Sequence, residues 1–385
     1  LERVADQEAL GVGSGAPRWA LARKFAPERV ATRLRAITWQ VGRTGVVTPV
    51  AELEPVELGG STVARATLHN ADEIARRDLR IGDRVWVEKA GEIIPALVGV
   101  DMAARPAEAE VYDFPDTCPA CAGALAREDG KAAWRCDNAA CPARVARRIA
   151  HFASSSAMDI GGLGPALIEA AVERGLVRTP ADLYRLRPAD LEALPGVGAR
   201  TAGKVVEAIA ASRERAGRDG ARLIYGLGLP GVGRESAGRL ASTYGGLEAL
   251  AAANAGALMK GEAEGGPGLG EATAGVVENY LRGETTRVEW AELRAAGVGV
   301  GWSRGAEGGA LAGEVVVVTG ALGRWTRAEA AERLAAAGAR VGTSVTRETT
   351  LVVAGEGAGA KLDAARERGI TVIDEAELAR RLGEP

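Results

Sequence analysis

The stretch CPACAGALAREDGKAAWRCDNAAC (residues 118–141) contains all four cysteines of the chain. Cys118 and Cys121 form a Cys-x2-Cys pair, Cys136 and Cys141 form a Cys-x4-Cys pair, and 14 residues separate the two pairs. A Cys-x2-Cys turn presents two thiolates to one tetrahedral ion, and the intervening segment is long enough for a hairpin that returns the second pair. Four thiolates fill the coordination shell, so the spacing predicts a structural Zn²⁺ site, with free buried thiols or two disulfides as the alternatives. Such a unit has almost no apolar core, so bound metal must stabilise it.

Upstream of the cysteines, short β-prone runs alternate with glycine turns. The runs cover residues 37–41, 46–50, 63–68 and 84–89. Short strands with frequent turns are typical of a small β-barrel, which we expect over residues 31–105, before a finger over 113–145.

Downstream, residues 146–298 are rich in Ala and Leu, and a glycine pattern repeats along them. Four Gly-x-Gly pairs, each enclosing an apolar residue and each followed by a helical run, lie at Gly162/Gly164, Gly196/Gly198, Gly231/Gly233 and Gly268/Gly270. The pattern is typical of helix–hairpin–helix units, in which glycine permits positive φ and close backbone approach. Backbone N–H groups of such a hairpin and of the next helix can bind a DNA phosphate without reading sequence. The alternative is that some of the four hairpins serve only for packing.

Residues 313–385 follow a Gly-rich stretch, 299–312, which we interpret as a flexible linker. VVVVT at 315–319 predicts a buried strand, and Thr326 with Glu329 forms a capping box for a helix that ends at a glycine. Further strands near 339–345, 349–354 and 370–373 and helices near 359–368 and at the end complete a small α/β domain.

Composition limits the function classes. The net charge is −3, from 48 basic and 51 acidic residues, so DNA contacts must come from local arrangement and not from bulk charge. There is no signal peptide and no apolar run long enough to span a membrane. We therefore expect a cytoplasmic protein, in whose reducing compartment clustered cysteines favour metal over disulfides.

Several stretches resemble the NAD-dependent DNA ligases of bacteria. APRWALARKFAPE (16–28) is similar to the final nucleotidyltransferase motif of their adenylation domain, the end of which we assign to residues 1–30. WQVGRTGVVTPVAELEPVELGG (39–60), ATLHNADEI (66–74) and RIGDRVWVEKAGEIIP (80–95) resemble their OB-fold domain. A four-cysteine zinc finger, a helix–hairpin–helix array and a terminal BRCT domain follow in the family's order, so the chain is expected to be a multidomain protein.

The resemblance implies roles for two basic residues. Lys24 matches the motif lysine that contacts the nucleotide phosphate, and Arg43 matches an OB-fold arginine needed for ligation. Without the resemblance, both would be interpreted as solvated surface charges. The resemblance also implies NAD⁺ and Mg²⁺ for the parent enzyme, which seals 5′-phosphate/3′-hydroxyl nicks in duplex DNA during replication and repair. We expect a monomer that is associated with the bacterial nucleoid when it is bound to nicked DNA.

In phosphate-binding BRCT domains, a Ser or Thr ending the first strand, the next Gly N–H and a Lys on the second helix converge on one phosphate. Thr319, Gly320 and Lys361 occupy the matching places. Together they would offer three donors to one dianion. The alternative is that Thr319 and Gly320 form only a turn and that Lys361 is a solvated lysine.

The chain departs from the family in one respect. The family's nucleophile is the lysine of a Lys-x-Asp-Gly motif, and this motif is absent here. Lys361-Leu362-Asp363-Ala364 lacks the glycine and lies in an expected helix, and His69 and His151 form no acid–base set. The opening residues read like the middle of a domain, so we expect a truncated piece that cannot adenylate itself. A non-catalytic zinc and helix–hairpin–helix scaffold for DNA repair is the alternative function.

Overall fold

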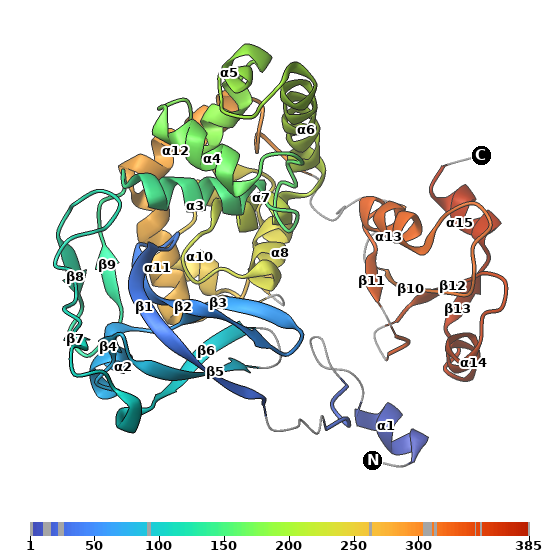
Figure 1. Cartoon of the computed structure of the whole chain (residues 1–385). Helices are drawn as coiled ribbons and strands as arrows, with labels where there is room; N and C mark the ends of the chain where they lie inside the picture. The colour runs from blue at the N-terminus through green and yellow to red at the C-terminus, as the bar shows by residue number, and fades with distance from the viewer. Residues whose placement is uncertain are drawn as a thin grey trace. The chain divides into compact units, whose positions relative to one another are not determined.

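The structure is a computed structural model. It describes residues 3–10, 17–21, 27–90, 94–261, 264–302, 310–311, 314–342, 344–346 and 349–383 (Figure 1). The chain divides into two compact units, residues 1–138 and residues 139–385, and each is described by itself. Among the described residues, no helix is both long enough and apolar enough to cross a membrane.

The first unit contains the expected β-barrel. Its strands are β1 (Arg29–Val41), β2 (Val46–Leu58), β3 (Ser61–Thr67), β5 (Arg84–Ala90) and β6 (Ile94–Val100). β1 pairs with both β2 and β5, and this double pairing closes the sheet. Inward residues alternate along each strand as the two-residue period requires, and they form one apolar core around Leu34, Val85 and Leu97.

The first unit also contains shorter elements. They are α1 (Val4–Leu10), α2 (Ala71–Arg76), β4 (Arg80–Ile81), the 3₁₀ turn η1 (Met102–Ala104) and β7 (Glu110–Val111). The metal-binding hairpin, β8 (Leu125–Arg127) and β9 (Trp134–Cys136), extends the barrel sheet because β9 pairs with β2.

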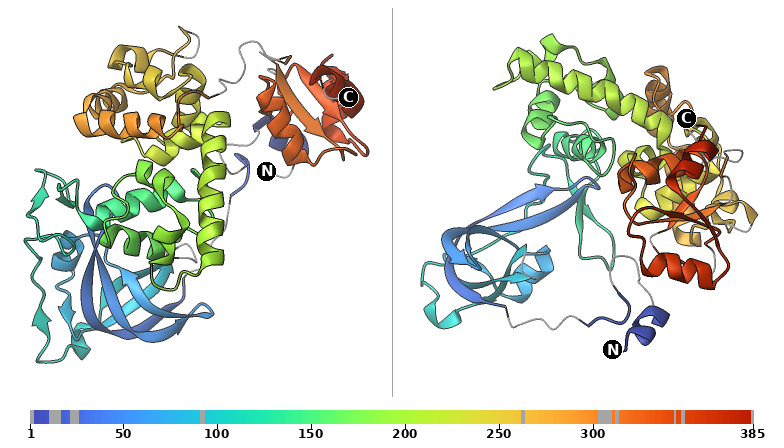
Figure 2. Two further views of the ribbon diagram at one scale, coloured as in Figure 1. Left: turned by 90° about the horizontal axis from the view of Figure 1, so that it is seen from above. Right: turned by 90° about the vertical axis from the view of Figure 1, so that its right-hand side faces the viewer.

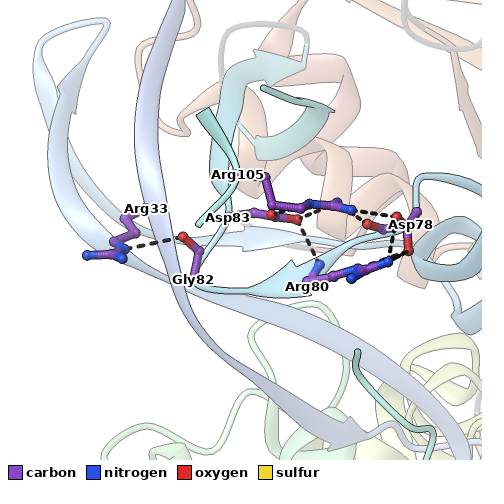
Figure 3. A network of polar contacts seen from close by, with 6 residues as sticks. All are labelled: Arg33, Asp78, Arg80, Gly82, Asp83 and Arg105. Atoms are coloured by element: carbon purple, nitrogen blue, oxygen red, sulfur yellow. Dashed lines mark hydrogen bonds and ion pairs between the residues drawn. The ribbon is translucent and has the colours of Figure 1, made fainter. Parts of the chain in front are cut away.

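A polar network fixes the segment after β6 to the turn before β5 (Figure 3). Arg105 lies between two carboxylates, with its Nε 2.8 Å from Asp83 Oδ1 and its Nη1 2.5 Å from Asp78 Oδ2. Asp83 is fully buried and also accepts the N–H of Arg80 at 2.8 Å. A buried carboxylate is tolerated only when its oxygens are paired, so Arg105 is a structural requirement of this corner.

The second unit begins with the expected helical region, which is shown in two further views in Figure 2. Its helices are α3 (Pro142–Ala153), α4 (Pro165–Glu173), η2 (Pro180–Arg185), α5 (Pro188–Glu192), α6 (Ala199–Arg218), α7 (Gly220–Leu227), α8 (Arg234–Thr243), α9 (Leu247–Ala251), α10 (Ala255–Met259), α11 (Glu271–Arg282) and α12 (Glu284–Ala295). One continuous core of Leu, Ile, Val and Ala side chains runs through them. A buried ion pair between Arg148 Nη2 and Glu289 Oε2, at 2.8 Å, connects α3 with α12.

The C-terminal domain has the expected element order. Its strands β10 (Val315–Thr319), β11 (Arg340–Gly342), β12 (Leu351–Ala354) and β13 (Thr371–Ile373) form a parallel sheet in the order β11-β10-β12-β13. The helices are α13 (Arg327–Ala336), α14 (Ala360–Glu367) and α15 (Glu375–Arg381).

The valine run of β10 explains the layers of this domain. Val316 and Val318 point into a core that includes Leu334 of α13 and Leu378 of α15, whereas Val317 packs with Ala365 of α14 on the other face. A strand covered on both faces reads as a continuous apolar run, and this is the pattern VVVVT.

The stretch interpreted as a linker is partly packed. Trp302 is 6% exposed and donates its indole N–H to the carbonyl of Ala241 at 3.0 Å. Leu311 is buried in the core of the C-terminal domain. Both ends of the stretch 299–312 thus belong to the neighbouring cores, and residues 303–309 lie outside the described part of the chain.

Candidate metal centre and nucleic-acid interface

The four cysteines converge on one point. The Sγ atoms of Cys118, Cys121, Cys136 and Cys141 all lie within 4.8 Å of one another. Ligand distances of about 2.3 Å around a tetrahedral zinc ion place sulfurs about 3.8 Å apart, and the Cys121–Cys136 sulfur separation is 3.6 Å. This separation is far longer than a disulfide bond of about 2.0 Å. None of the four forms a disulfide and three of them are buried, so their arrangement fits Zn²⁺ and not two disulfides.

The first cysteine pair sits on a tight turn that aims both thiols at this point. The N–H of Cys118 donates to Gly123 at 2.8 Å, and Ala122, with φ of 55°, donates back to Cys118 at 2.9 Å. Burial raises the pKa of the Cys121 thiol, but hydrogen bonds from the Gly123 N–H and the Asn138 side chain outweigh it and hold that pKa at about 7. The turn therefore favours the thiolate, which is the form that binds metal.

The four Gly-x-Gly pairs form four hairpins of one geometry. The first glycine of each pair has positive φ, with values of 82°, 75°, 74° and 61° for Gly162, Gly196, Gly231 and Gly268. The enclosed residue packs toward the helical core, fully for Leu163 and Leu269 and partly for Val197 and Val232. The first glycines are therefore required by the fold itself, because their backbone conformation is one that other residues rarely adopt.

At the second position of each pair, neither the backbone conformation nor the packing requires glycine. Gly164, Gly198, Gly233 and Gly270 are the N-cap residues of α4, α6, α8 and α11, and all four have negative φ in the extended region. A Cβ added at any of them would meet nothing within 4 Å. Neither conformation nor packing demands glycine, and Ser, Thr, Asp or Asn would cap these helices better. A close approach of an external group to the backbone is the remaining physical reason for glycine.

The hairpins differ in charge. α6 carries the exposed cations Arg200 and Lys204 in its first two turns, and α8 begins with the exposed Arg234. Exposed cations at a helix N-terminus oppose the helix dipole by about 0.3–1 kcal/mol each, so their presence favours an external anion there. In α8 the neighbouring Glu235 also lies in the first turn. α4 begins instead with Pro165, which has no N–H, and α11 begins with Glu271.

The fourth hairpin also uses its own amides. Gly268 donates to the carbonyl of Lys260 at 2.7 Å, and Leu269 donates to the carbonyl of Leu258 at 2.9 Å. The residue between the glycines also donates its N–H within the fold in the other three hairpins, from Leu163, Val197 and Val232 to Ile160, Leu194 and Leu229. The bonded N–H of the first glycine, Gly268, is therefore what distinguishes the fourth hairpin. The sequence analysis left open that some hairpins serve only for packing but did not say which; the charge at the helix start was the available signal.

The proposed phosphate residues of the C-terminal domain line one cavity of about 650 Å³. Thr319, Gly320 and Lys361 share its wall with Arg327, which sequence reasoning missed. Gly320 has φ of 78°, and a Cβ there would lie 2.5 Å from the carbonyl oxygen of Gly355. The turn alone thus explains this glycine. Lys361 and Arg327 give the cavity two cations, and Glu356 adds one carboxylate to its lining.

The two residues expected to act in ligation differ in what the structure describes. Arg43 is half-buried in the turn between β1 and β2. Lys24 lies outside the described residues. Lys361, in the rejected Lys-Leu-Asp-Ala sequence, lies in α14 as expected.

Comparisons with known families and proteins follow the same domain order. Models of the NAD-dependent DNA ligase OB-fold domain and the NAD-dependent DNA ligase C4 zinc finger domain match residues 31–109 and 117–143. A SAM-like helix-hairpin-helix tandem matches 155–211, a helix-hairpin-helix motif matches 222–288, and the BRCA1 C Terminus (BRCT) domain matches 310–382.

Similar curated proteins are named DNA ligases. DNA ligase 1 of Opitutus terrae is 47% identical over 382 residues, which are 99% of this chain and 56% of that protein. The DNA ligase of Chloroflexus aggregans is 45% identical over 387 residues, 100% of this chain and 56% of that protein. The DNA ligase of Symbiobacterium thermophilum is 46% identical over 382 residues, which are 98% of this chain and 56% of that protein. The chain thus spans about half the length of the curated relatives it matches.

Proposed function

Because the chain carries the OB-fold and C4 zinc finger domains of the NAD-dependent DNA ligases, it belongs to that family, and we propose that it holds nicked duplex DNA in position for sealing. The observation that carries this proposal is that the N-cap glycines of the second and third hairpins, Gly198 and Gly233, face open space on helices that carry exposed cations. They leave helix N–H groups accessible to phosphate oxygens, and such contacts position a duplex without reading its sequence. A scaffold without ligase chemistry is not favoured, because the OB-fold and zinc finger match ligase domains.

The contribution of the chain to the reaction is positioning. In the family's reaction a lysine takes adenylate from NAD⁺ and passes it to the 5′-phosphate of the nick, and the 3′-hydroxyl then displaces AMP. Holding the two DNA ends together converts the last step into an effectively unimolecular one. Arg43 and Lys24 are proposed to contact phosphate in this reaction, with NAD⁺ and Mg²⁺ acting in the whole enzyme.

The second and third hairpins, at Gly196/Gly198 and Gly231/Gly233, are proposed to make the main phosphate contacts. Each combines an accessible N-cap glycine, Gly198 or Gly233, with cations of the same helix, Arg200, Lys204 and Arg234. In the fourth hairpin the first glycine, Gly268, donates its N–H within the fold, and α11 begins with Glu271 and has no cation in its first turn, so its proposed role is packing.

A binding experiment tests the proposal directly. The whole chain is titrated against labelled duplexes with and without one nick, and against single strands of the same length. Tighter binding to the nicked duplex, with little dependence on base sequence, is expected. Equal affinity for nicked duplex and single strand would contradict a role in aligning a nick.

The absence of the Lys-x-Asp-Gly sequence has its own test. We expect the chain to remain unlabelled after incubation with Mg²⁺ and NAD⁺ that carries a labelled adenylate. A stable lysine-linked AMP on this chain would show that another lysine serves as nucleophile.

The C-terminal domain is proposed to bind a phosphate, for DNA, through Thr319, Gly320 and Lys361. The cavity that these residues line with Arg327 supports this role. Affinity of the whole chain for duplex ends should fall when the 5′-phosphate is removed, and Lys361→Ala should abolish that difference. If neither change matters, this domain contacts DNA elsewhere or binds protein.

A further inference from the structure

The turn between β1 and β2 has one defined conformation. Gly42 donates its N–H to Val46 at 2.8 Å, and Gly45 donates to Gly42 at 2.9 Å. Gly45 is buried and has φ of 84°, which requires glycine. Arg43 lies in this turn, so the conformation of the turn decides where its guanidinium can reach.

The metal-binding hairpin, β8 and β9, donates two hydrogen bonds to this turn. Cys136 donates its backbone N–H to the carbonyl of Gly45 at 2.9 Å, and Arg135 Nη1 donates to the carbonyl of Thr44 at 3.2 Å. Both acceptors lie within two residues of Arg43. One of the donors is the backbone of a zinc ligand, so the metal centre and the turn share a residue.

The strand that makes these contacts depends on the metal at one end. β8 and β9 have three residues each, and Cys136 is the only buried residue among them. β9 pairs with β2 only at Val46 and Val47, and a hairpin of this size is not stable by itself in water, so this short pairing leaves the cysteine end dependent on the metal. At the other end Trp134 stacks on Phe114, with ring centroids 4.7 Å apart, so that end has an anchor of its own. The end that touches the Arg43 turn has the cysteine instead.

We infer that the zinc finger is a positioning element for Arg43, with Arg135 and the Cys136 backbone as the residues that transmit zinc occupancy to the β1–β2 turn. This inference rests on the proposed role of Arg43 at the nick for its functional consequence, whereas the coupling itself is structural. A zinc-free chain would keep its barrel but lose the fixed placement of Arg43.

Amide exchange of the full chain, followed by NMR, tests the coupling without DNA. The reporters are the N–H groups of Gly42 and Gly45, because both are bonded within the turn and not to the finger. Zinc is removed with a chelator, and its loss is verified by elemental analysis. Exchange at both reporters should accelerate by roughly tenfold or more, while the amides of Val85 and Val87 in the barrel core keep their rates. Unchanged exchange at Gly42 and Gly45 in the zinc-free chain would overturn the inference.

Variants test whether Arg135 acts through Arg43. Arg135→Ala should weaken binding to nicked duplex roughly threefold to fivefold with zinc content unchanged, and Arg135→Lys, which keeps a cationic donor group, should restore part of the loss. Lys131→Ala, an exposed cation of the same hairpin, is the matched control and should have no effect.

The double variant separates the two roles. Arg43→Ala combined with Arg135→Ala should bind no more weakly than Arg43→Ala alone, since Arg135 has nothing left to position. Additive losses would mean that Arg135 contacts DNA independently, and this would contradict the inference. If Arg43→Ala binds as the wild type while the turn amides respond to zinc, the coupling holds and the proposed role of Arg43 is what fails.

Discussion

Cys141 contributes to both the metal centre and the helix that follows it. It belongs to the cysteine cluster and is also the N-cap of α3, which follows with Pro142 at its first position. A thiolate at a helix N-terminus is stabilised by the helix dipole, so this placement favours the metal-binding form of the residue. One residue thus contributes both to the metal centre and to the start of the helical region.

Removing one thiolate should remove the metal. We expect about one zinc per chain in the purified protein, and Cys118→Ser should lower this content severalfold, because three sulfurs leave the tetrahedral shell open. Elemental analysis is the measurement, with Lys131→Ala as the control that keeps its metal. Iron in place of zinc, or full zinc content in Cys118→Ser, would contradict the assignment.

The Arg148–Glu289 pair is the most deeply buried ion pair of the helical region in the described residues. Glu289 is 5% exposed. Burial raises the pKa of Glu289, and the guanidinium of Arg148 offsets this only in part. The folded state therefore holds a proton on Glu289 more tightly than the unfolded chain does. Its contribution to stability is complete below the ordinary carboxyl pKa and is lost as the pH rises through the raised value.

Replacing the cation should expose this pH dependence. Arg148→Met leaves Glu289 buried without its partner and should lower the free energy of unfolding by about 3 kcal/mol near pH 7. The loss should shrink as the pH is lowered from 7 through the raised pKa of Glu289, because Glu289 then takes up a proton. Urea unfolding at several pH values measures it, with the exposed Arg147→Met of the same helix as control. A loss that is constant across this range would show that Glu289 does not carry the effect.

At the level of elements, the four hairpins share a backbone and differ in what their helices offer. The positive φ of the first glycine is a local requirement, so all four hairpins meet it. The phosphate-binding capacity depends on free amides and on charge, which are set by residues such as Arg200 and Glu271 beyond the glycine pair. Repeated units often divide into binding units and packing units in this way.

Replacing an N-cap glycine with aspartate distinguishes an effect on protein stability from an effect on DNA binding. Gly198→Asp places a good N-cap where there is space, so the stability of the chain should be kept or slightly raised. Its carboxylate would repel a phosphate, and affinity for nicked duplex should fall roughly tenfold, or about 1.4 kcal/mol. Gly270→Asp is the matched control, with the same open space beside Glu271, and should bind as the wild type. Equal losses in both variants would contradict the proposed division of the hairpins.

For the whole molecule, the net charge of −3 sets the character of DNA binding. A chain with almost equal numbers of acidic and basic residues has no general attraction to a polyanion. Affinity must come from a few cations and from backbone amides, which release few counterions when they bind.

The salt dependence of binding should therefore be shallow. If Arg200, Lys204 and Arg234 are the main cationic contacts, the logarithm of the binding constant should fall with the logarithm of salt concentration with a slope of about −3. Titration of nicked duplex at several salt concentrations gives this slope, and Arg234→Ala should reduce its size by about 1. A much steeper slope would point to a basic surface that the hairpins do not account for.

The sequence by itself determined the features that depend on local spacing. The cysteine pairs, the capping box of Thr326 and Glu329 and the run VVVVT each specify their structure within a few residues, and the structure contains all three. The domain order followed from the same local patterns, because each pattern belongs to one kind of element and the elements appear in sequence. The residues thus predicted the fold class and the metal ligands.

Only the tertiary structure decided which distant residues meet. Arg105 reaches Asp83 across 22 residues, and Arg135 reaches Thr44 across 91 residues, because barrel closure and strand pairing bring them together. No periodicity in the sequence encodes such contacts, since they depend on the register between strands that are far apart along the chain. The same holds for the hairpins: the glycines were visible in the sequence, but the open space at the second glycine and the bonded N–H of Gly268 in the fourth hairpin exist only once the helices have packed.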